Sequence, residues 1–365
     1  MPDTHAHVDT RSRPGDPSRV FDGRVGQTVA ATAVTDHDLR IDPARYPSEG
    51  EWAFCRFDDP AIPALRMGFQ RGGFNIWPDD RPVDANLLQL HLEVMTADGA
   101  LLWLPTGTIP AAELQLIPGS RDLRLAPGGT EILSITGWPH VTWHARSADG
   151  ELETHLEVDV RTTTVLPDCV LPHAVFAMWE TAGSATGWVR IGERTTPVRG
   201  RVFHDHTRVI HRHHAVPPRR MYLYTTLALD DGSAVFGYHA VDSDGRPIPD
   251  YCFGIHVDPA GQGTFLARTA DLAIELDADG LPARWRIDWA TDDDGLAVRA
   301  EVRVRPLPLL RAWGGPGTPA DLRAFPIVPL VLDADVEVRD AHGPRTVTGA
   351  GVAEHFDADT WPGQQ

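Results

Sequence analysis

The sequence predicts an all-β protein built from two tandem antiparallel β-barrel or β-sandwich domains. Apolar and polar residues alternate with a period of two in many short segments, turn signals such as Asp-Gly separate those segments, and helical periodicity is scarce. Short strands joined by tight turns are typical of antiparallel meanders rather than of βαβ units. The 33 glycines and 31 prolines agree with a loop-rich β protein.

The clearest predicted strands lie in both halves of the chain. Between residues 88 and 94, apolar residues alternate with Gln89, His91 and Glu93, which predicts one apolar face and one polar face. An Ala-Asp-Gly turn leads from this strand into the next. The other segments with this alternation are 100–104, 152–161, 188–191, 221–229, 285–289, 298–304 and 332–338.

The chain divides into three predicted parts. Residues 1–22 are polar and lack the apolar core of a signal peptide, so we expect a disordered leader. We expect an N-terminal β domain at residues 23–195 and a C-terminal β domain at residues 196–365, with a turn or linker near 193–197 between them. No apolar run approaches the length that spans a membrane, so we expect a cytoplasmic protein without stable membrane insertion.

Composition and motifs limit the partners. A formal net charge of -18 argues against binding to nucleic acid, which requires a basic surface. Cys55, Cys169 and Cys252 lie far apart without a CxxC spacing, which indicates buried, reduced thiols rather than disulfides or a zinc site. No Gly-rich phosphate loop follows a strand and opens a helix, so we expect no nucleotide cofactor. The oligomeric state stays open.

The strongest candidate site is the stretch 199–214, which holds five of the seventeen histidines around one acid, Asp205. If residues 201–207 are extended, odd and even positions point to opposite faces. Phe203, Asp205 and Thr207 then share one face, and His204 and His206 share the other. An aspartate in an apolar interior keeps its proton, because burial disfavours its charge, and can act as a general acid.

Other interpretations of this stretch stay open. Asp205 could instead form a salt bridge with Arg201 or Arg208. His204 and His206 are spaced so that both could ligate one metal ion, but no third ligand is identifiable, and we expect no metal. The whole stretch could also be a solvated loop rich in histidine.

Aromatic residues are candidates for the wall of an apolar ligand cavity. Their faces can also stabilise a cation. The residues that we expect to contact a substrate are Phe203, Tyr222, Tyr224, Trp179, Trp188 and Tyr238. Because tryptophans in sheets commonly belong to the core, packing is the alternative role for Trp179 and Trp188.

Several of these segments resemble a known family. Gly200-Arg-Val-Phe-His-Asp-His-Thr-Arg is similar to the Gly-x-x-x-x-Asp-His-x-x-Gly signature of a lipocalin-like superfamily. This superfamily includes carotenoid 1,2-hydratases, AttH-like proteins, kievitone hydratase and lipocalin-like Diels–Alderases. Residues 51–60 resemble its Glu-Trp opening, residues 179–188 its strand before the signature, and residues 347–354 its closing Gly-x-Gly-x-x-Glu element.

The resemblance implies two tandem lipocalin-like domains with a ligand cavity in or between them. In hydratases of this family, the aspartate at the position of Asp205 protonates an isolated C=C bond, and water captures the resulting cation. By this resemblance His204 and His206 assist the reaction or line the pocket. Phe203 stands where carotenoid hydratases carry tyrosine, which indicates a different pocket and argues against a carotenoid substrate.

The sequence therefore predicts a cofactor-independent hydratase, dehydratase or cyclising isomerase that acts on a small, apolar, isoprenoid-like substrate. In enzyme terms this is a hydro-lyase or an isomerase, with Asp205 as the general acid. Two alternatives stay open: a Diels–Alderase-like pericyclase that acts by shaping its substrate, and a carrier that binds a terpenoid or lipid without chemistry.

Overall fold

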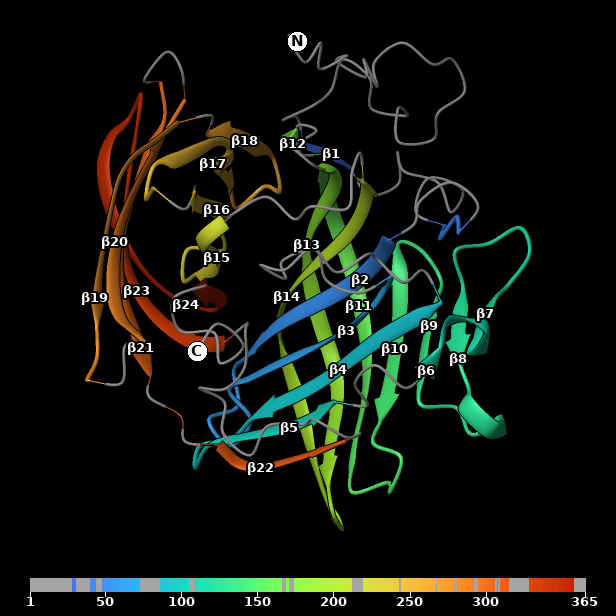
Figure 1. The fold of residues 1–365 in the computed structure, drawn as a ribbon. Coiled ribbons are helices and arrows are strands. Elements are labelled where there is room, and N and C mark those ends of the chain that lie inside the picture. Colours follow the sequence, from blue (N-terminus) through green and yellow to red (C-terminus); the bar gives the residue numbers. More distant parts are fainter. Residues whose placement is uncertain are drawn as a thin grey trace, which may run out of the picture.

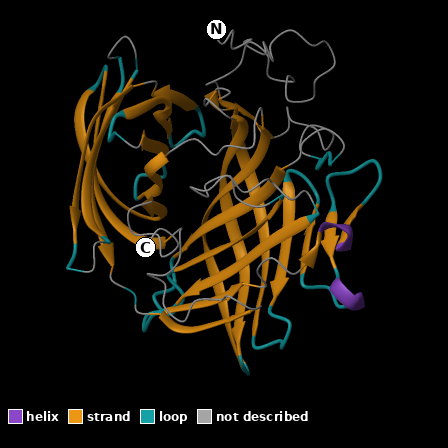
Figure 2. Cartoon of the chain, in the orientation of Figure 1, coloured by secondary structure: helices purple, strands orange, loops and turns teal. Residues whose placement is uncertain are grey.

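The computed structural model describes residues 28–30, 40–43, 48–72, 86–104, 109–165, 169–170, 174–211, 219–242, 244–266, 268–278, 281–291, 295–305, 307, 309–314 and 328–357. These residues form strands β1 to β24, and their helical content is confined to two 3-10 helices, η4 (Ala111–Glu113) and η5 (Pro127–Gly129) (Figure 2). The predicted all-β fold class is confirmed. No helix in this part of the chain has the length and hydropathy required to cross a membrane.

The first sheet contains 15 strands. In hydrogen-bonding order its main path is β22 (Leu309–Gly314), β5 (Ala100–Leu104), β4 (Leu87–Met95), β3 (Ala64–Arg71), β2 (Ser48–Phe57), β14 (Arg194–His211), β13 (Ala174–Ile191), β11 (Leu152–Val165), β10 (His140–Arg146), β9 (Leu133–Thr136), β8 (Leu123–Leu125) and β7 (Leu114–Leu116). Three short strands pair off this path: β1 (Thr28–Ala30), β12 (Cys169–Val170) and β6 (Ile109–Pro110). The ladder between β22 and β5 is parallel, and the others are antiparallel.

The second sheet contains nine antiparallel strands. Their order is β18 (Gly263–Leu266), β17 (Pro247–Val257), β16 (Ala234–Asp242), β15 (Arg219–Leu229), β24 (Gly343–Asp357), β23 (Val328–Asp340), β21 (Ala297–Arg305), β20 (Pro282–Ala290) and β19 (Arg268–Leu276). Figure 1 shows both sheets curled, with β15 and β24 of the second sheet turned toward the first. Two curled antiparallel sheets are the architecture of two lipocalin-like domains.

The strands predicted from alternation are all present. They correspond to β4, β5, β11, the end of β13, β15, β20, β21 and β23. Two of the three cysteines, Cys55 and Cys252, are buried, reduced thiols, as predicted. The side chain of Cys169 and the predicted leader at residues 1–22 lie outside the described residues.

The predicted boundary after residue 195 falls at the start of β14. Along its full length β14 pairs with β13, and from residue 200 to residue 209 it also pairs with β2. The strand that carries Asp205 is therefore part of the first sheet, and β22 from the second half of the chain joins the same sheet beside β5. As a division into domains, the boundary stays a prediction.

Apolar side chains form three buried clusters, one within each sheet and one between the sheets. Alternation along single strands decides which cluster a residue joins. On β15, Tyr222 and Tyr224 belong to the cluster between the sheets, whereas Leu223 and Leu227 belong to the core of the second sheet. The strands that face the other sheet therefore have both faces covered, which is how charged side chains on them come to be buried.

A candidate acid site between the two sheets

Strand β14 places Asp205 between the sheets. Phe203, two residues earlier on the same face, belongs to the buried cluster that residues of both sheets form. His204 points to the opposite face, where its ring meets the edge of Trp143 in the core of the first sheet with 5.5 Å between centroids. The Asp-His signature thus divides as the alternation predicts, with the acid on one face and the histidines on the other.

Asp205 has a second carboxyl group beside it. In the antiparallel register Asp205 lies directly opposite Glu180 of β13 on one side and Trp52 of β2 on the other. Directly opposite residues share one face of a sheet. Asp205 is 4% exposed and Glu180 is 1% exposed. We call these two residues the carboxyl pair.

Hydroxyl groups surround the carboxyl pair. Thr207 Oγ1 donates a hydrogen bond to Asp205 Oδ1 at 3.5 Å. From the second sheet, the hydroxyl of Tyr224 donates to Glu180 Oε2 at 3.0 Å. The Tyr224 ring stacks on Tyr238 with 4.4 Å between centroids and receives the edge of Phe54 at 5.1 Å. Aromatic rings of both sheets therefore pack around the tyrosine that binds Glu180.

A buried arginine lies in the same layer. Arg66 of β3 is 0% exposed and donates to Glu93 Oε1 of β4 at 2.7 Å and to Glu354 of β24. It also lies over the Trp52 ring, 5.9 Å from the centroid. Glu354 in turn accepts a hydrogen bond from the Tyr222 hydroxyl at 3.1 Å. Arg66 therefore links the two sheets through a network without access to solvent.

Burial and mutual repulsion raise the pKa values of the carboxyl pair. Burial, followed by the charges of Glu180 and Glu354, raises the pKa of Asp205 well above its ordinary value. Burial and the charge of Glu354 likewise raise the pKa of Glu180, although the hydrogen bond from Tyr224 opposes them. Because the two groups interact, they titrate as a pair, and the protonated form of the pair is favoured relative to an ordinary carboxyl group.

The pKa values of three neighbouring groups are raised as well. Burial raises the pKa of Glu93 to about 7, against the opposing charge of Arg66. Burial and the charge of Glu180 raise the pKa of the Tyr224 and Tyr238 hydroxyls well above the ordinary tyrosine value. The site therefore contains neutral proton donors in an apolar, aromatic setting, which is the arrangement that general acid catalysis requires.

On the other face of β14, the histidines bind a different acid. Glu51 of β2 lies 3.1 Å from His204 Nε2 and 3.4 Å from His206 Nδ1, and Arg121 also donates to it. Burial would raise the pKa of Glu51, but Arg121 and the two histidines outweigh it and hold that pKa well below its ordinary value. Burial lowers the pKa of His204. The structure does not bring His204 and His206 together with Asp205.

The predicted aromatic contacts divide into two sets. Phe203, Tyr222, Tyr224 and Tyr238 lie in the cluster between the sheets. Trp188 does not join them: it lies eight residues beyond Glu180 on β13 and stacks on His155 of β11 at 5.9 Å. Trp179 pairs with His206 in the strand register, but its side chain lies outside those described.

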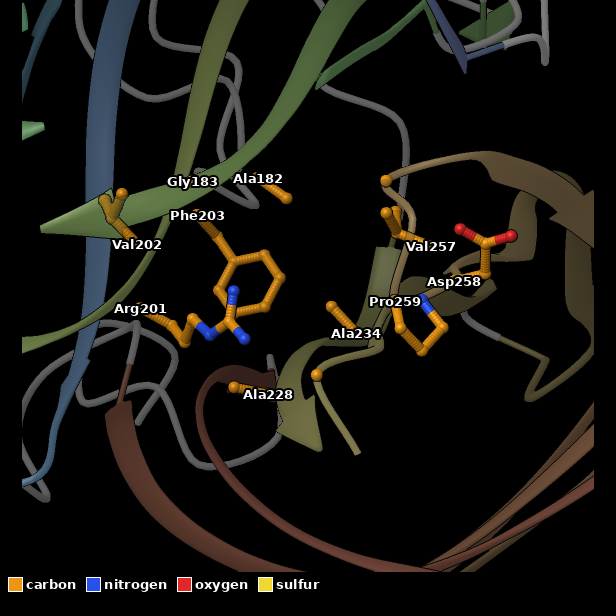
Figure 3. A pocket seen from close by; sticks show the side chains of 12 residues that line it. Ala182, Gly183, Arg201, Val202, Phe203, Ala228, Ala234, Val257, Asp258 and Pro259 are labelled. Carbon is orange, nitrogen blue, oxygen red and sulfur yellow. The ribbon is translucent and has the colours of Figure 1, made fainter. Parts of the chain in front are cut away.

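A small cleft opens where the two sheets meet beside Phe203. Figure 3 shows Phe203 and Arg201 of β14 pointing toward Ala234 and Pro259 of the second sheet. The cleft has a volume of about 30 Å³. That volume holds water, and it is far below the several hundred Å³ of typical ligand pockets. In the described residues, no group of three or more His, Cys, Asp or Glu side chains is arranged to hold a metal ion.

No protein-family model matches the chain, and no curated protein sequence matches it. Among the solved structures that are similar to it are an AttH protein and a kievitone hydratase. A provisionally named AttH protein of Nitrosomonas europaea aligns with a TM-score of 0.57 and 12% identity, covering 87% of this chain and 95% of its own. Kievitone hydratase of Nectria haematococca aligns with a TM-score of 0.52 and 9% identity, covering 86% and 89%.

The chain has the fold of these two proteins, which confirms the fold that the sequence predicted. At these identities the similarity concerns the fold alone.

Four acidic or basic residues of the site were not among the predicted site residues: Glu180, Glu354, Arg66 and Glu93. Two of them had a signal in the sequence, because Glu180 follows Trp179 in the segment before the signature and Glu354 closes the Gly-x-Gly-x-x-Glu element. Arg66 and Glu93 had none, since an alternating strand gives its polar positions the appearance of a solvated face.

Proposed function

We propose that this protein is a cofactor-independent enzyme that protonates an isolated C=C bond of a small, apolar, isoprenoid-like substrate, with Asp205 as the proton donor. The reaction is hydration, its reverse, or isomerisation with or without ring closure. The observation that carries this proposal is the carboxyl pair, which is buried between the sheets and whose pKa values are raised well above the ordinary carboxyl values. The fold shared with a kievitone hydratase is compatible with it.

The proposed steps balance without a cofactor. Asp205 gives its proton to one alkene carbon, and the electron pair of the C=C bond forms the new C–H bond. The other carbon becomes cationic, and the faces of Tyr224, Tyr238 and Phe203 stabilise it. A water oxygen bonds to that carbon, and the proton that this water loses returns to the carboxyl pair. Loss of a neighbouring C–H proton instead gives an isomer and also restores the pair.

In the proposed reaction, Glu180 disfavours ionisation of Asp205 and accepts a proton from water. Because it lies directly opposite Asp205, its charge discourages ionisation of Asp205 before substrate arrives. The Tyr224 hydroxyl holds one oxygen of Glu180, while Glu180 Oε1 is buried without a hydrogen-bond partner. That oxygen is suited to receive the proton from the attacking water.

The cleft beside Phe203 is the proposed entrance for the substrate. Small residues line much of it, among them Ala182 on the first sheet and Ala228 and Ala234 on the second. Its present volume of about 30 Å³ admits water, so the substrate enters by displacing aromatic side chains between the sheets.

The test is turnover in D2O. The purified protein is extracted with organic solvent, mass spectrometry identifies any bound apolar molecule, and compounds of that class with isolated C=C bonds are then incubated in D2O. We expect products that carry one non-exchangeable deuterium on the carbon that was protonated. Asp205→Asn keeps the shape of the side chain but removes the acid, and we expect turnover to fall by about 10²–10⁴-fold. Asp98→Asn, in the exposed turn after β4, is the matched control.

Three outcomes separate the alternatives. A product that contains no deuterium and forms equally well in the Asp205→Asn variant indicates a pericyclase that acts by substrate shape. A bound compound recovered unchanged after incubation with wild type indicates a carrier. Full turnover with deuterium incorporation in the Asp205→Asn variant contradicts the proposed acid.

A further inference from the structure

A second cavity lies on the other side of the second sheet. Its volume is about 440 Å³, within the range of small-molecule pockets. Met221 of β15 and His239 and Val241 of β16 form one wall, and Thr269, Leu272 and Ile274 of β19 form the other.

This cavity is separate from the carboxyl pair because the strands between them alternate. His239 and its neighbour Tyr238 point to opposite faces of β16. Tyr238 belongs to the cluster between the sheets, whereas His239 lies directly opposite Leu223, a residue of the second sheet's own core. The two sites therefore lie back to back across one layer of sheet.

The cavity follows from the way in which the second sheet curls. Strands β17 and β19 approach each other, yet among the described residues no ladder joins them. The β19–β20 register shifts between Thr269 and Asp271. A bulge of this kind bends a strand and occurs frequently at the rims of barrels. The cavity lies at this unpaired seam, between β16 and the edge strand β19.

The lining combines apolar side chains with the carboxylate of Asp271, which is paired with Arg286, and with two buried polar atoms that lack partners. Met221, Leu272 and Ile274 are half-buried against the core of the second sheet. His239 Nδ1 and Thr269 Oγ1 are buried without a hydrogen-bond partner. Burial lowers the pKa of His239 to about 4, so its ring is neutral at pH 7 and offers one donor and one acceptor. Unsatisfied polar atoms of this kind favour a ligand that completes their hydrogen bonds.

We propose that this cavity binds a small, neutral, largely apolar molecule with one hydroxyl or carbonyl oxygen, which forms hydrogen bonds with His239 and Thr269. A neutral imidazole supplies no charge to hold an anion, and the net charge of the chain, -18, opposes one. Asp271, the one charged residue among the described residues of the lining, is already paired with Arg286, which makes an organic cation unfavourable as well. The proposal does not depend on the acid site between the sheets.

The experiment compares two probes that differ by one hydroxyl group, 2-naphthol and naphthalene, in fluorescence titrations at pH 7. Wild type should bind both with 1:1 stoichiometry and should prefer 2-naphthol by about fivefold to tenfold, the contribution of one hydrogen bond. Thr269→Val and His239→Phe each remove one polar atom at nearly constant shape. Both variants should lose the preference for the hydroxyl and keep the binding of naphthalene.

Two further variants test whether the probes bind in this cavity. Ile274→Trp fills the cavity and should abolish the binding of both probes. Asp205→Asn changes the acid site between the two sheets and should leave both affinities unchanged. The inference is overturned if neither probe binds saturably to wild type, or if Thr269→Val and His239→Phe both retain the wild-type preference for 2-naphthol. Near-UV circular dichroism of each variant verifies that it is folded, and Thr269→Ser, which restores the hydroxyl, should restore the preference.

Discussion

Replacing either member of the carboxyl pair should flatten the pH dependence of stability above neutrality. The ordinary pKa values are 3.8 for Asp205 and 4.5 for Glu180, so an unfolded chain has released both protons by pH 7. The folded chain releases these protons at higher pH than the unfolded chain does, because the pKa values of the pair are raised. A carboxyl group whose pKa is raised on folding contributes its full stabilisation at pH values below its pKa in the unfolded chain. That stabilisation is lost as the pH rises through its pKa in the folded chain.

The magnitude follows from the number of retained protons. Each proton that the folded state holds and the unfolded state does not reduces the free energy of unfolding by about 1.4 kcal/mol per pH unit. A single proton held from pH 7 to pH 9 therefore lowers the stability by roughly 2.7 kcal/mol over that interval. Asp205→Asn combined with Glu180→Gln removes both titrating groups and should eliminate this part of the slope.

The assay is urea unfolding at pH 7, 8 and 9, followed by tryptophan fluorescence. Glu93→Gln is a matched control, because the pKa of Glu93 is raised only to about 7. In the Glu93→Gln variant, the change of the free energy of unfolding with pH should differ from wild type below pH 7 and should equal that of wild type above pH 8. If the Asp205→Asn/Glu180→Gln variant has the wild-type slope between pH 7 and pH 9, the pair does not hold a proton in that range and the reasoning is refuted.

Three other perturbations test the packing around the site. Arg66→Met should lower the free energy of unfolding by about 3–5 kcal/mol, because it leaves the buried carboxylates of Glu93 and Glu354 without their cation, and adding Glu93→Gln should recover part of that loss in urea unfolding. Burial lowers the pKa of His355 to about 4, so the stability that its neutral ring contributes is complete above the unfolded pKa of 6.5 and is lost as pH falls toward 4. His355→Phe should therefore reduce the loss of stability in acid by up to about 3 kcal/mol in urea unfolding. A variant with the wild-type dependence of stability on pH below 6.5 would contradict this. Gly351→Ala should cost about 1–3 kcal/mol in thermal or urea unfolding, because its Cβ would lie 1.7 Å from a backbone oxygen of β15, and a neutral effect would show that β24 moves away without penalty.

The sequence allowed the fold to be predicted because strand alternation is a local property. The segment at 88–94 and the turn after it specify β4 and β5 without reference to any other part of the chain. The short motifs at 51–60, 200–208 and 347–354 indicated a lipocalin-like fold, although no single one of them is specific. Their common order along the chain carried the prediction.

The acid site could be predicted only in part, because it depends on contacts between distant strands. Alternation placed Asp205 and His204 on opposite faces of β14, as the structure shows. It could not show that Asp205 lies beside Glu180, since that requires the register of β13 against β14. The polar face of β4, with His91 and Glu93, looked solvated, yet the two residues are 5% and 2% exposed because the second sheet covers them.

The most direct test of the central claim is the protonation state of Asp205 itself. Carboxyl groups of aspartate are labelled with ¹³C, the signal of Asp205 is assigned by its loss in the Asp205→Asn variant, and its chemical shift is followed by NMR from pH 5 to pH 9. The account predicts that this carboxyl group remains protonated at pH 7, because burial and the charges of Glu180 and Glu354 raise its pKa. A signal that titrates near the ordinary value of 3.8 and is fully ionised at pH 7 would contradict the account.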